Sequence, residues 1–88
     1  MEAEAALRAV RGLAKANRLV FTKHAAREAV ECWASREDVC CALANAKGIR
    51  ASGKGRASDW TVTGPDQDGD DLEVAIVLED GILVITVY

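Results

Sequence analysis

The last seventeen residues contain the feature that most constrains the fold. Two apolar runs, 72–78 and 82–88, flank Asp80-Gly81, a dipeptide typical of two-residue β-hairpin turns. Such a turn pairs Ala75 with Thr86 and Glu73 with Tyr88. One face of the hairpin is then wholly apolar and must be covered by helices. That face comprises Leu72, Val74, Ile76, Leu78, Leu83, Ile85 and Val87.

The opposite face of this hairpin has a mixed composition. It carries Glu73, Ala75, Val77, Val84, Thr86 and Tyr88. A surface that combines polar, apolar and aromatic side chains suits binding, so we expect the functional site on this face.

The first half of the chain has the spacing of helices. Apolar residues at helical intervals predict a helix over 4–16, with Asn17 as a left-handed stop. Thr22 is expected to cap a second helix, in which an apolar stripe packs on the core: Ala26, Val30 and Trp33. Ser35 and Asp38 have the spacing of a capping box, which begins a third helix ending at Gly48.

Beyond residue 48 the pattern changes to that of strands. We expect strands over 49–52, 59–63, 72–78 and 82–88, while 18–22 is a short β-rich stretch. With 88 residues there is room for one core, so residues 1–88 are expected to form a single domain. The predicted fold is α+β, with N-terminal helices packed on one face of a small antiparallel sheet.

Composition favours an ordinary globular protein. Half of the residues are hydrophobic and 28% are charged, and the apolar runs are strand-sized, so no membrane span is expected. The N-terminus lacks the basic and apolar regions of a secretory signal, so we expect a cytoplasmic location. The odd number of cysteines suits buried reduced thiols better than disulfides: Cys32, Cys40 and Cys41.

The charges are distributed unevenly along the chain. Residues 1–60 contain eleven basic and seven acidic residues, a net charge of +4, whereas residues 61–88 carry −7. Such asymmetry indicates contact with a polyanion through one face. The basic residues expected to meet phosphates are Lys23, Arg50, Lys54 and Arg56.

Three residue types needed for RNA cleavage without a metal occur in suitable places. His24, the only histidine, can exchange a proton near neutral pH and lies off the predicted apolar stripe. Arg27 follows one turn later, beside Glu31 on the same stripe, and can stabilise phosphate charge. Tyr88, the only tyrosine, can stack on a base or donate a proton. We expect no metal ligand set and no cofactor.

The two tryptophans are expected to serve the core. Trp33 lies on the predicted apolar stripe of the second helix. Trp60 can belong to either face of the sheet, because the sequence does not fix the register across the loop that follows its strand.

Several of these motifs together resemble a known group of proteins. Phe21-Thr22-Lys23-His24-Ala25 with Arg27, the helix that begins at Ser35 and the closing Thr86-Val87-Tyr88 resemble a bacterial domain family of unknown function. That family is similar to the RelE, BrnT and MqsR ribonuclease toxins. The resemblance covers 18–88 as a toxin-like α+β core, and 1–17 is an additional N-terminal helix.

The resemblance implies a RelE/barnase-like fold with a curved sheet. It also implies a type II toxin-like, metal-independent endoribonuclease, or mRNA interferase, that a partner antitoxin neutralises. His24 and Arg27 would face the RNA backbone, and Tyr88 would be the closing aromatic residue. The expected partners are RNA and an antitoxin protein, with a homodimer as a further option.

Two other functions remain open at this point. A catalytically silent protein-interaction module of the same fold would use the same sheet face for a partner protein. An acidic mimic of nucleic acid would require a continuous stripe of carboxylates, but residues 66–80 place them mainly in turns. Convergence of His24, Arg27, the basic loop and Tyr88 on one cleft would favour the nuclease.

Overall fold

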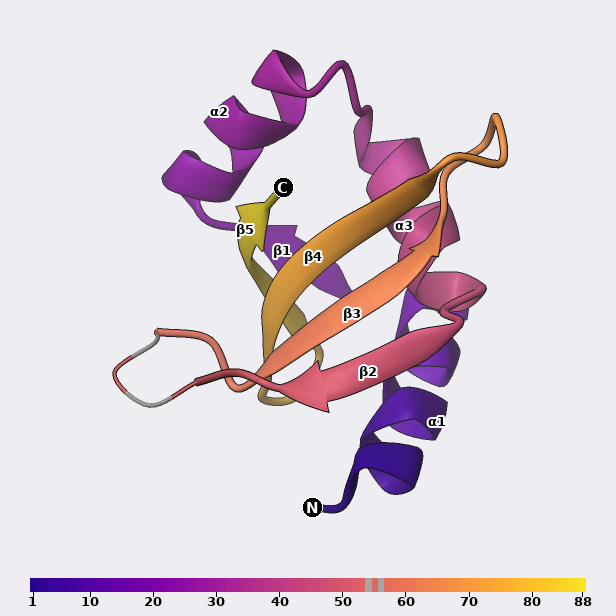
Figure 1. Cartoon of the computed structure of the whole chain (residues 1–88), viewed down its shortest axis with the longest axis vertical. Coiled ribbons are helices and arrows are strands. Elements are labelled where there is room, and N and C mark those ends of the chain that lie inside the picture. The colour runs from indigo at the N-terminus through magenta and orange to yellow at the C-terminus, as the bar shows by residue number, and fades with distance from the viewer. Residues whose placement is uncertain (54, 56) are drawn as a thin grey trace.

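A computed structural model describes residues 1–53, 55 and 57–88 of the chain. The described part is an α+β fold, in which three helices and five strands follow one another (Figure 1). Their order is α1 (Ala3–Lys15), β1 (Leu19–Phe21), α2 (Lys23–Glu31), α3 (Arg36–Ala44), β2 (Gly48–Ala51), β3 (Trp60–Pro65), β4 (Asp71–Leu78) and β5 (Ile82–Val87). None of the described helices is long and apolar enough to cross a membrane.

The five strands form one mixed sheet in the order β1-β5-β4-β3-β2. Strands β2 to β5 pair in antiparallel fashion, but β1 runs parallel to β5, with Leu19 opposite Ile82 and Phe21 opposite Val84. The expectation of a purely antiparallel sheet is therefore wrong. The three residues of β1 are too few to show by their pattern which strand they join or in which direction.

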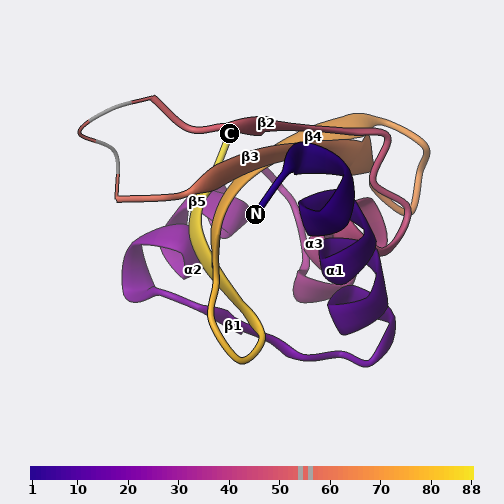
Figure 2. The ribbon, with the colours of Figure 1, turned by 90° about the horizontal axis from the view of Figure 1, so that it is seen from below.

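All three helices contribute to the same hydrophobic core, on one side of the sheet. In Figure 2, β2, β3 and β4 form one layer above α1 and α3, while β5 and β1 curl down beside the helices. Each helix contributes buried side chains to this core, including Val10 from α1, Ala29 from α2 and Leu43 from α3. Helices α1 and α3 pack on one face of the sheet, as expected, whereas α2 lies beside β5 and β1.

A glycine sets the distance between the sheet and α3. A Cβ atom at Gly64 of β3 would lie 1.9 Å from the carbonyl oxygen of Ala42. Only glycine permits this approach, because a clash with backbone cannot be relieved by rotating a side chain. The absence of a side chain at Gly64 therefore lets α3 lie directly against β3.

The hairpin between β4 and β5 differs from the predicted register close to its turn. Leu78 pairs with Ile82 across a three-residue turn, and a β-bulge on β5 restores the predicted pairing of Ala75 with Thr86. The extra residue is Ile85. Val84 is consequently buried in the core, whereas Leu83 and Ile85 are only half-buried, so their predicted faces were wrong.

The predicted end of the first helix and the predicted starts of the second and third are confirmed, but α3 ends at Ala44 and not at Gly48, which instead begins β2. Asn17 has a φ of +59°, the left-handed conformation that ends α1. Thr22 accepts a hydrogen bond on Oγ1 from the N–H of Ala25, at 3.0 Å, and caps α2. Ser35 and Asp38 form a complete capping box at the start of α3.

The face of α2 that packs on the core is not the predicted one. Its buried residues are Ala25 and Ala29. Val30 is 75% exposed and Trp33 is 94% exposed, so the expected apolar stripe faces solvent. Small side chains let α2 approach β5 closely, and this packing outweighs the larger apolar area of the other stripe. Trp60, by contrast, is partly buried against the core.

The cysteines are only partly where they were expected. All three are free thiols. Cys40 and Cys41 are half-buried, but Cys32 is exposed at the end of α2, so the expectation of three buried thiols is wrong for Cys32.

The buried face of β4 can be tested by a pair of substitutions. Ile76 is fully buried and Val77 is half-buried. Ile76→Ala should lower the free energy of unfolding by about 2 to 5 kcal/mol, since it leaves a cavity in the core. Val77→Ala should cost clearly less in the same denaturant titration. Equal losses would show that the two sheet faces are assigned wrongly.

Candidate functional site

The outer edge of β5 is completed by side chains of α2. Strand β1 covers this edge only as far as Val84, whose carbonyl accepts from the N–H of Thr22 at 3.1 Å. Further along, the Val87 N–H donates to Glu28 Oε1 at 3.2 Å, and Cys32 Sγ lies 3.9 Å from the Val87 carbonyl oxygen. Partly buried backbone groups need such partners, so α2 is fixed beside the last residues of β5.

The same Glu28 carboxylate also holds the only histidine of the chain. His24 Nε2 lies 3.3 Å from Glu28 Oε2, one helical turn away. The Glu28 side chain is 25% exposed, while that of His24 is 67% exposed. A half-buried carboxylate thus orients an accessible imidazole beside the end of β5.

Tyr88 follows Val87 directly, and its backbone bonds to β4, the neighbour of β5 on the side away from α2. Its N–H donates to the Glu73 carbonyl at 3.0 Å, and its half-exposed side chain lines a polar pocket of about 180 Å³. Besides Tyr88, which follows β5, the pocket is lined by residues of β2, β3 and the segment between them: Arg50, Ala51, Ser52, Gly53, Ser58 and Thr61.

Three hydroxyl groups form the polar wall of this pocket. Ser52 Oγ lies 2.9 Å from Ser58 Oγ and 3.3 Å from Thr61 Oγ1. Ser58 and Thr61 are buried, so these hydroxyls are held in place by one another. Each hydroxyl can donate as well as accept, which suits an oxyanion ligand.

Ion pairs cross the open face of the sheet next to the pocket. Arg50 Nη1 donates to Glu73 Oε1 at 2.9 Å, and Lys47 Nζ donates to Asp71 Oδ1 at 2.8 Å. Both pairs connect β2, or the residue before it, with β4 across the intervening β3. They are largely exposed, so a phosphate can compete for the cations at modest cost.

The predicted site residues are only partly brought together. Tyr88 and Arg50 line one pocket, and His24 is linked to the residue before Tyr88 through Glu28. Arg27 and Lys23 are exposed on α2, and among the described residues neither takes part in the contacts that fix this site. The predictions for Lys54 and Arg56 fall outside the described residues.

Sequence reasoning missed four residues of the site. Glu28 could have been found, because a carboxylate four residues after a histidine is the usual spacing of a helical pair. The hydroxyl groups gave no comparable signal, since they come together only in the folded structure: Ser52, Ser58 and Thr61.

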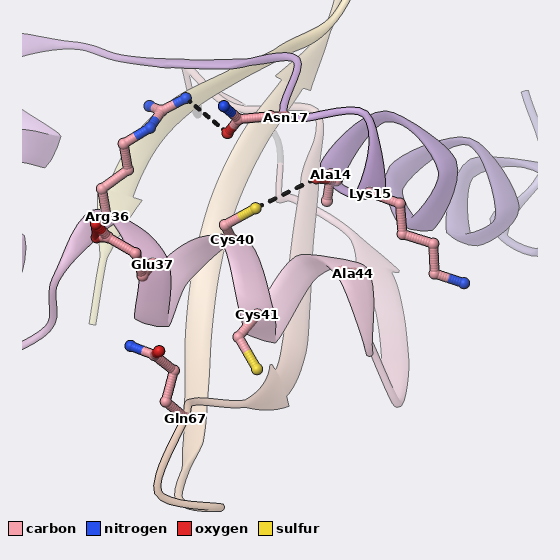
Figure 3. A pocket seen from close by; sticks show the side chains of 9 residues that line it. All are labelled: Ala14, Lys15, Asn17, Arg36, Glu37, Cys40, Cys41, Ala44 and Gln67. Carbon is pink, nitrogen blue, oxygen red and sulfur yellow. Dashed lines mark hydrogen bonds between the residues drawn. The ribbon is translucent and has the colours of Figure 1, made fainter.

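A larger cavity of about 460 Å³ lies elsewhere, between the end of α1 and α3 (Figure 3). Its polar walls are occupied by internal contacts. Arg36 Nη2 donates to Asn17 Oδ1 at 3.2 Å, and the Cys40 thiol donates to the Ala14 carbonyl at 3.2 Å. None of the predicted site residues lines this cavity, and it is separate from the pocket of Tyr88.

Gln67, at the rim of this cavity, connects the β3–β4 turn to α3. Its backbone N–H and side-chain amide both donate to Asp38 Oδ1, at 3.1 and 3.2 Å. The Ser35 backbone N–H donates to Asp38 Oδ2 at 3.0 Å. These hydrogen bonds, that from the Ser35 backbone first, lower the pKa of Asp38 to about 2.

Comparison with known proteins gives no match to a family model, to a curated protein or to a solved structure.

The depressed pKa of Asp38 predicts a specific acid sensitivity. Ionised Asp38 stabilises the fold at neutral pH, and this contribution should be lost as pH falls from about 4, the ordinary range of an aspartate, to about 2. The melting temperature of Asp38→Asn should therefore lie below that of the wild type at pH 6, and the gap should close across this window. Glu37→Gln, in the same helical turn, is the control. A gap independent of pH would contradict the assigned cause.

Proposed function

We propose that this protein is a metal-independent endoribonuclease of the toxin kind, which an antitoxin protein keeps in check. The observation that supports it best is the link from His24 through Glu28 to the Val87 N–H, next to Tyr88. It joins a proton-transfer group on α2 to the end of β5, where a phenol, an arginine and three hydroxyls surround a pocket. The antitoxin is implied by the resemblance to the RelE-type toxins.

In this proposal Glu28 and His24 act as an oriented base. With Nε2–H directed at the Glu28 carboxylate, Nδ1 is left to take the proton of a ribose 2′-hydroxyl. The 2′-oxygen then attacks phosphorus, and the bond from phosphorus to the 5′-oxygen breaks. The leaving oxygen takes a proton from the Tyr88 hydroxyl or from water, and a 2′,3′-cyclic phosphate remains. Glu28 stabilises the imidazolium that forms.

The pocket next to Tyr88 would receive the phosphate or the adjoining ribose. Its hydroxyl groups can donate to phosphate oxygens, and Arg50 can add a positive charge once it leaves Glu73. The Tyr88 ring, 53% exposed, offers a face on which a base can stack.

The ion pairs on the sheet favour a second candidate. Arg50 and Lys47 already have carboxylate partners, so much of the positive charge of this face is neutralised. A catalytically silent module that binds a partner protein through the same face would need no free cation. The two functions differ in whether RNA is cleaved.

The ribonuclease is tested by removing its base. His24→Ala should lower single-turnover cleavage of RNA by about 100- to 10,000-fold, the usual contribution of a general acid–base group. The melting temperature should change little, because the side chain is 67% exposed. Glu28→Gln, which can still accept from Val87, should lower the rate through the lost charge. Activity should persist in EDTA.

Two further outcomes decide between the candidates. Glu31→Gln, on the same helix, is the matched control and should cleave like the wild type. Intact RNA with folded wild-type protein would remove the ribonuclease and leave the binding module. Cleavage that is unchanged in His24→Ala would remove His24 as the base.

Arg50 and Glu73 provide a test of phosphate binding. Arg50→Ala should weaken binding of single-stranded RNA and reduce the slope of log affinity against log salt by about 0.7, the value for one lost phosphate contact. Glu73→Gln should strengthen binding, because it releases Arg50. Asp70→Asn removes an equal charge in the β3–β4 turn and is the control. If both acidic substitutions have the same effect, Arg50 does not contact phosphate.

A further inference from the structure

The flank of α2 that faces away from His24 presents an apolar surface to solvent. Val30 and Trp33 are the largest exposed apolar residues of this helix and its end, at 75% and 94% exposure. Next to them is a groove of about 330 Å³, between α2, β1 and the start of α3. Its walls are mostly apolar: Phe21, Ala26, Ala29, Val30, Ala34, Ser35 and Arg36.

Trp33 occupies a backbone position that suits a tryptophan poorly. Its φ is +57°. The Trp33 N–H donates to the Val30 carbonyl, and the Ala34 N–H donates to the Ala29 carbonyl. In this type of helix ending, the residue with positive φ is usually glycine or asparagine. The equivalent residue of α1 is Asn17, with the same two bonds. A bulky residue in the left-handed region is strained. At Trp33 this strain accompanies an aromatic ring that packs on almost nothing, so the fold itself does not explain the residue.

Positive charge borders the groove. At 3.6 residues per turn, Lys23 and Arg27 lie beside Val30 on α2. Arg36 lies on the far side of the groove, and its guanidinium is 5.8 Å from the centre of the Phe21 ring. Among the described residues, none of these three cations forms an ion pair with a carboxylate. The Glu28 carboxylate is engaged on the other flank of the helix, with His24 and Val87.

We propose that this groove is a docking surface for an acidic, amphipathic segment of a partner protein. An apolar side chain of the partner enters the groove beside Trp33, and carboxylates on either side of it meet Lys23, Arg27 and Arg36. The volume is at the lower end of the range of about 300 to 1,000 Å³ for binding pockets, which suits one or two side chains as anchors. Complementary charge then selects the partner. The proposal does not depend on RNA cleavage, because none of the residues that line the groove takes part in the contacts of His24, Glu28 and Val87.

The test is selection of short peptides from a random display library on the full-length protein, with counter-selection on Trp33→Gly. Trp33→Gly suits the left-handed position, so its melting temperature should equal or exceed that of the wild type. The selected peptides should combine Asp or Glu with Leu, Ile or Phe. Trp33→Gly and Val30→Ser should each weaken their binding at least about tenfold, or about 1.4 kcal/mol. Arg36→Glu should weaken it as well, and added salt should have the same effect.

Several results would overturn the proposal. They are peptides without acidic residues, peptides that bind Trp33→Gly equally well, and the absence of any peptide specific for the wild type. Sedimentation identifies a second copy as the occupant if the wild type dimerises and Val30→Ser does not. Loss of RNA binding in Trp33→Gly would assign the surface to RNA instead. Unchanged RNA binding together with acidic, apolar peptides supports the docking surface, whether or not the chain cleaves RNA.

Discussion

The outer edge of β5 is the constraint on which the rest of this structure depends. A three-residue β1 can pair with only part of a six-residue β5, so the remaining backbone groups must find other partners. Glu28 of α2 and Cys32, directly after the helix, meet this need at Val87. The position of α2 follows from this contact, and so do the placement of His24 on one flank of the helix and of the apolar groove on the other.

The bulge in β5 determines which side chains of this strand face the core and which face the candidate site. Without the extra residue at Ile85, a strand that begins opposite Leu78 would turn Thr86 and Val87 to the wrong faces. With it, Val84 and Val87 both enter the core, and Tyr88 reaches the open face beside Arg50. A local irregularity in one strand therefore decides which side chains are available for chemistry.

Much of the fold could be predicted from the sequence wherever a single local signal had one meaning. Asn17, Thr22 and the pair Ser35 and Asp38 mark helix ends through hydrogen bonds formed within a few residues, and all of these predictions are confirmed. The errors arose where distant contacts decide. The Asp80-Gly81 turn allows more than one length, and only packing against the helices selects the register with a bulge.

The error at α2 has a different physical reason. Alanines occur on both sides of this helix, so the larger Val30 and Trp33 dominated the predicted stripe, although close packing against β5 favours Ala25 and Ala29. The candidate site was likewise only partly predictable. Two of the predicted residues, Tyr88 and Arg50, line one pocket, but the hydroxyl groups of that pocket come together only in the folded structure.

Arg36 has a consequence for the behaviour of the protein at high concentration. Strand β1 is an edge of the sheet, and an open edge can recruit strands from other molecules and start aggregation. The carbonyl of Leu19 on that edge already accepts a hydrogen bond from the Arg36 guanidinium at 3.0 Å. A charged side chain thus occupies a place that an invading strand would need, so α3 protects the β1 edge of the sheet.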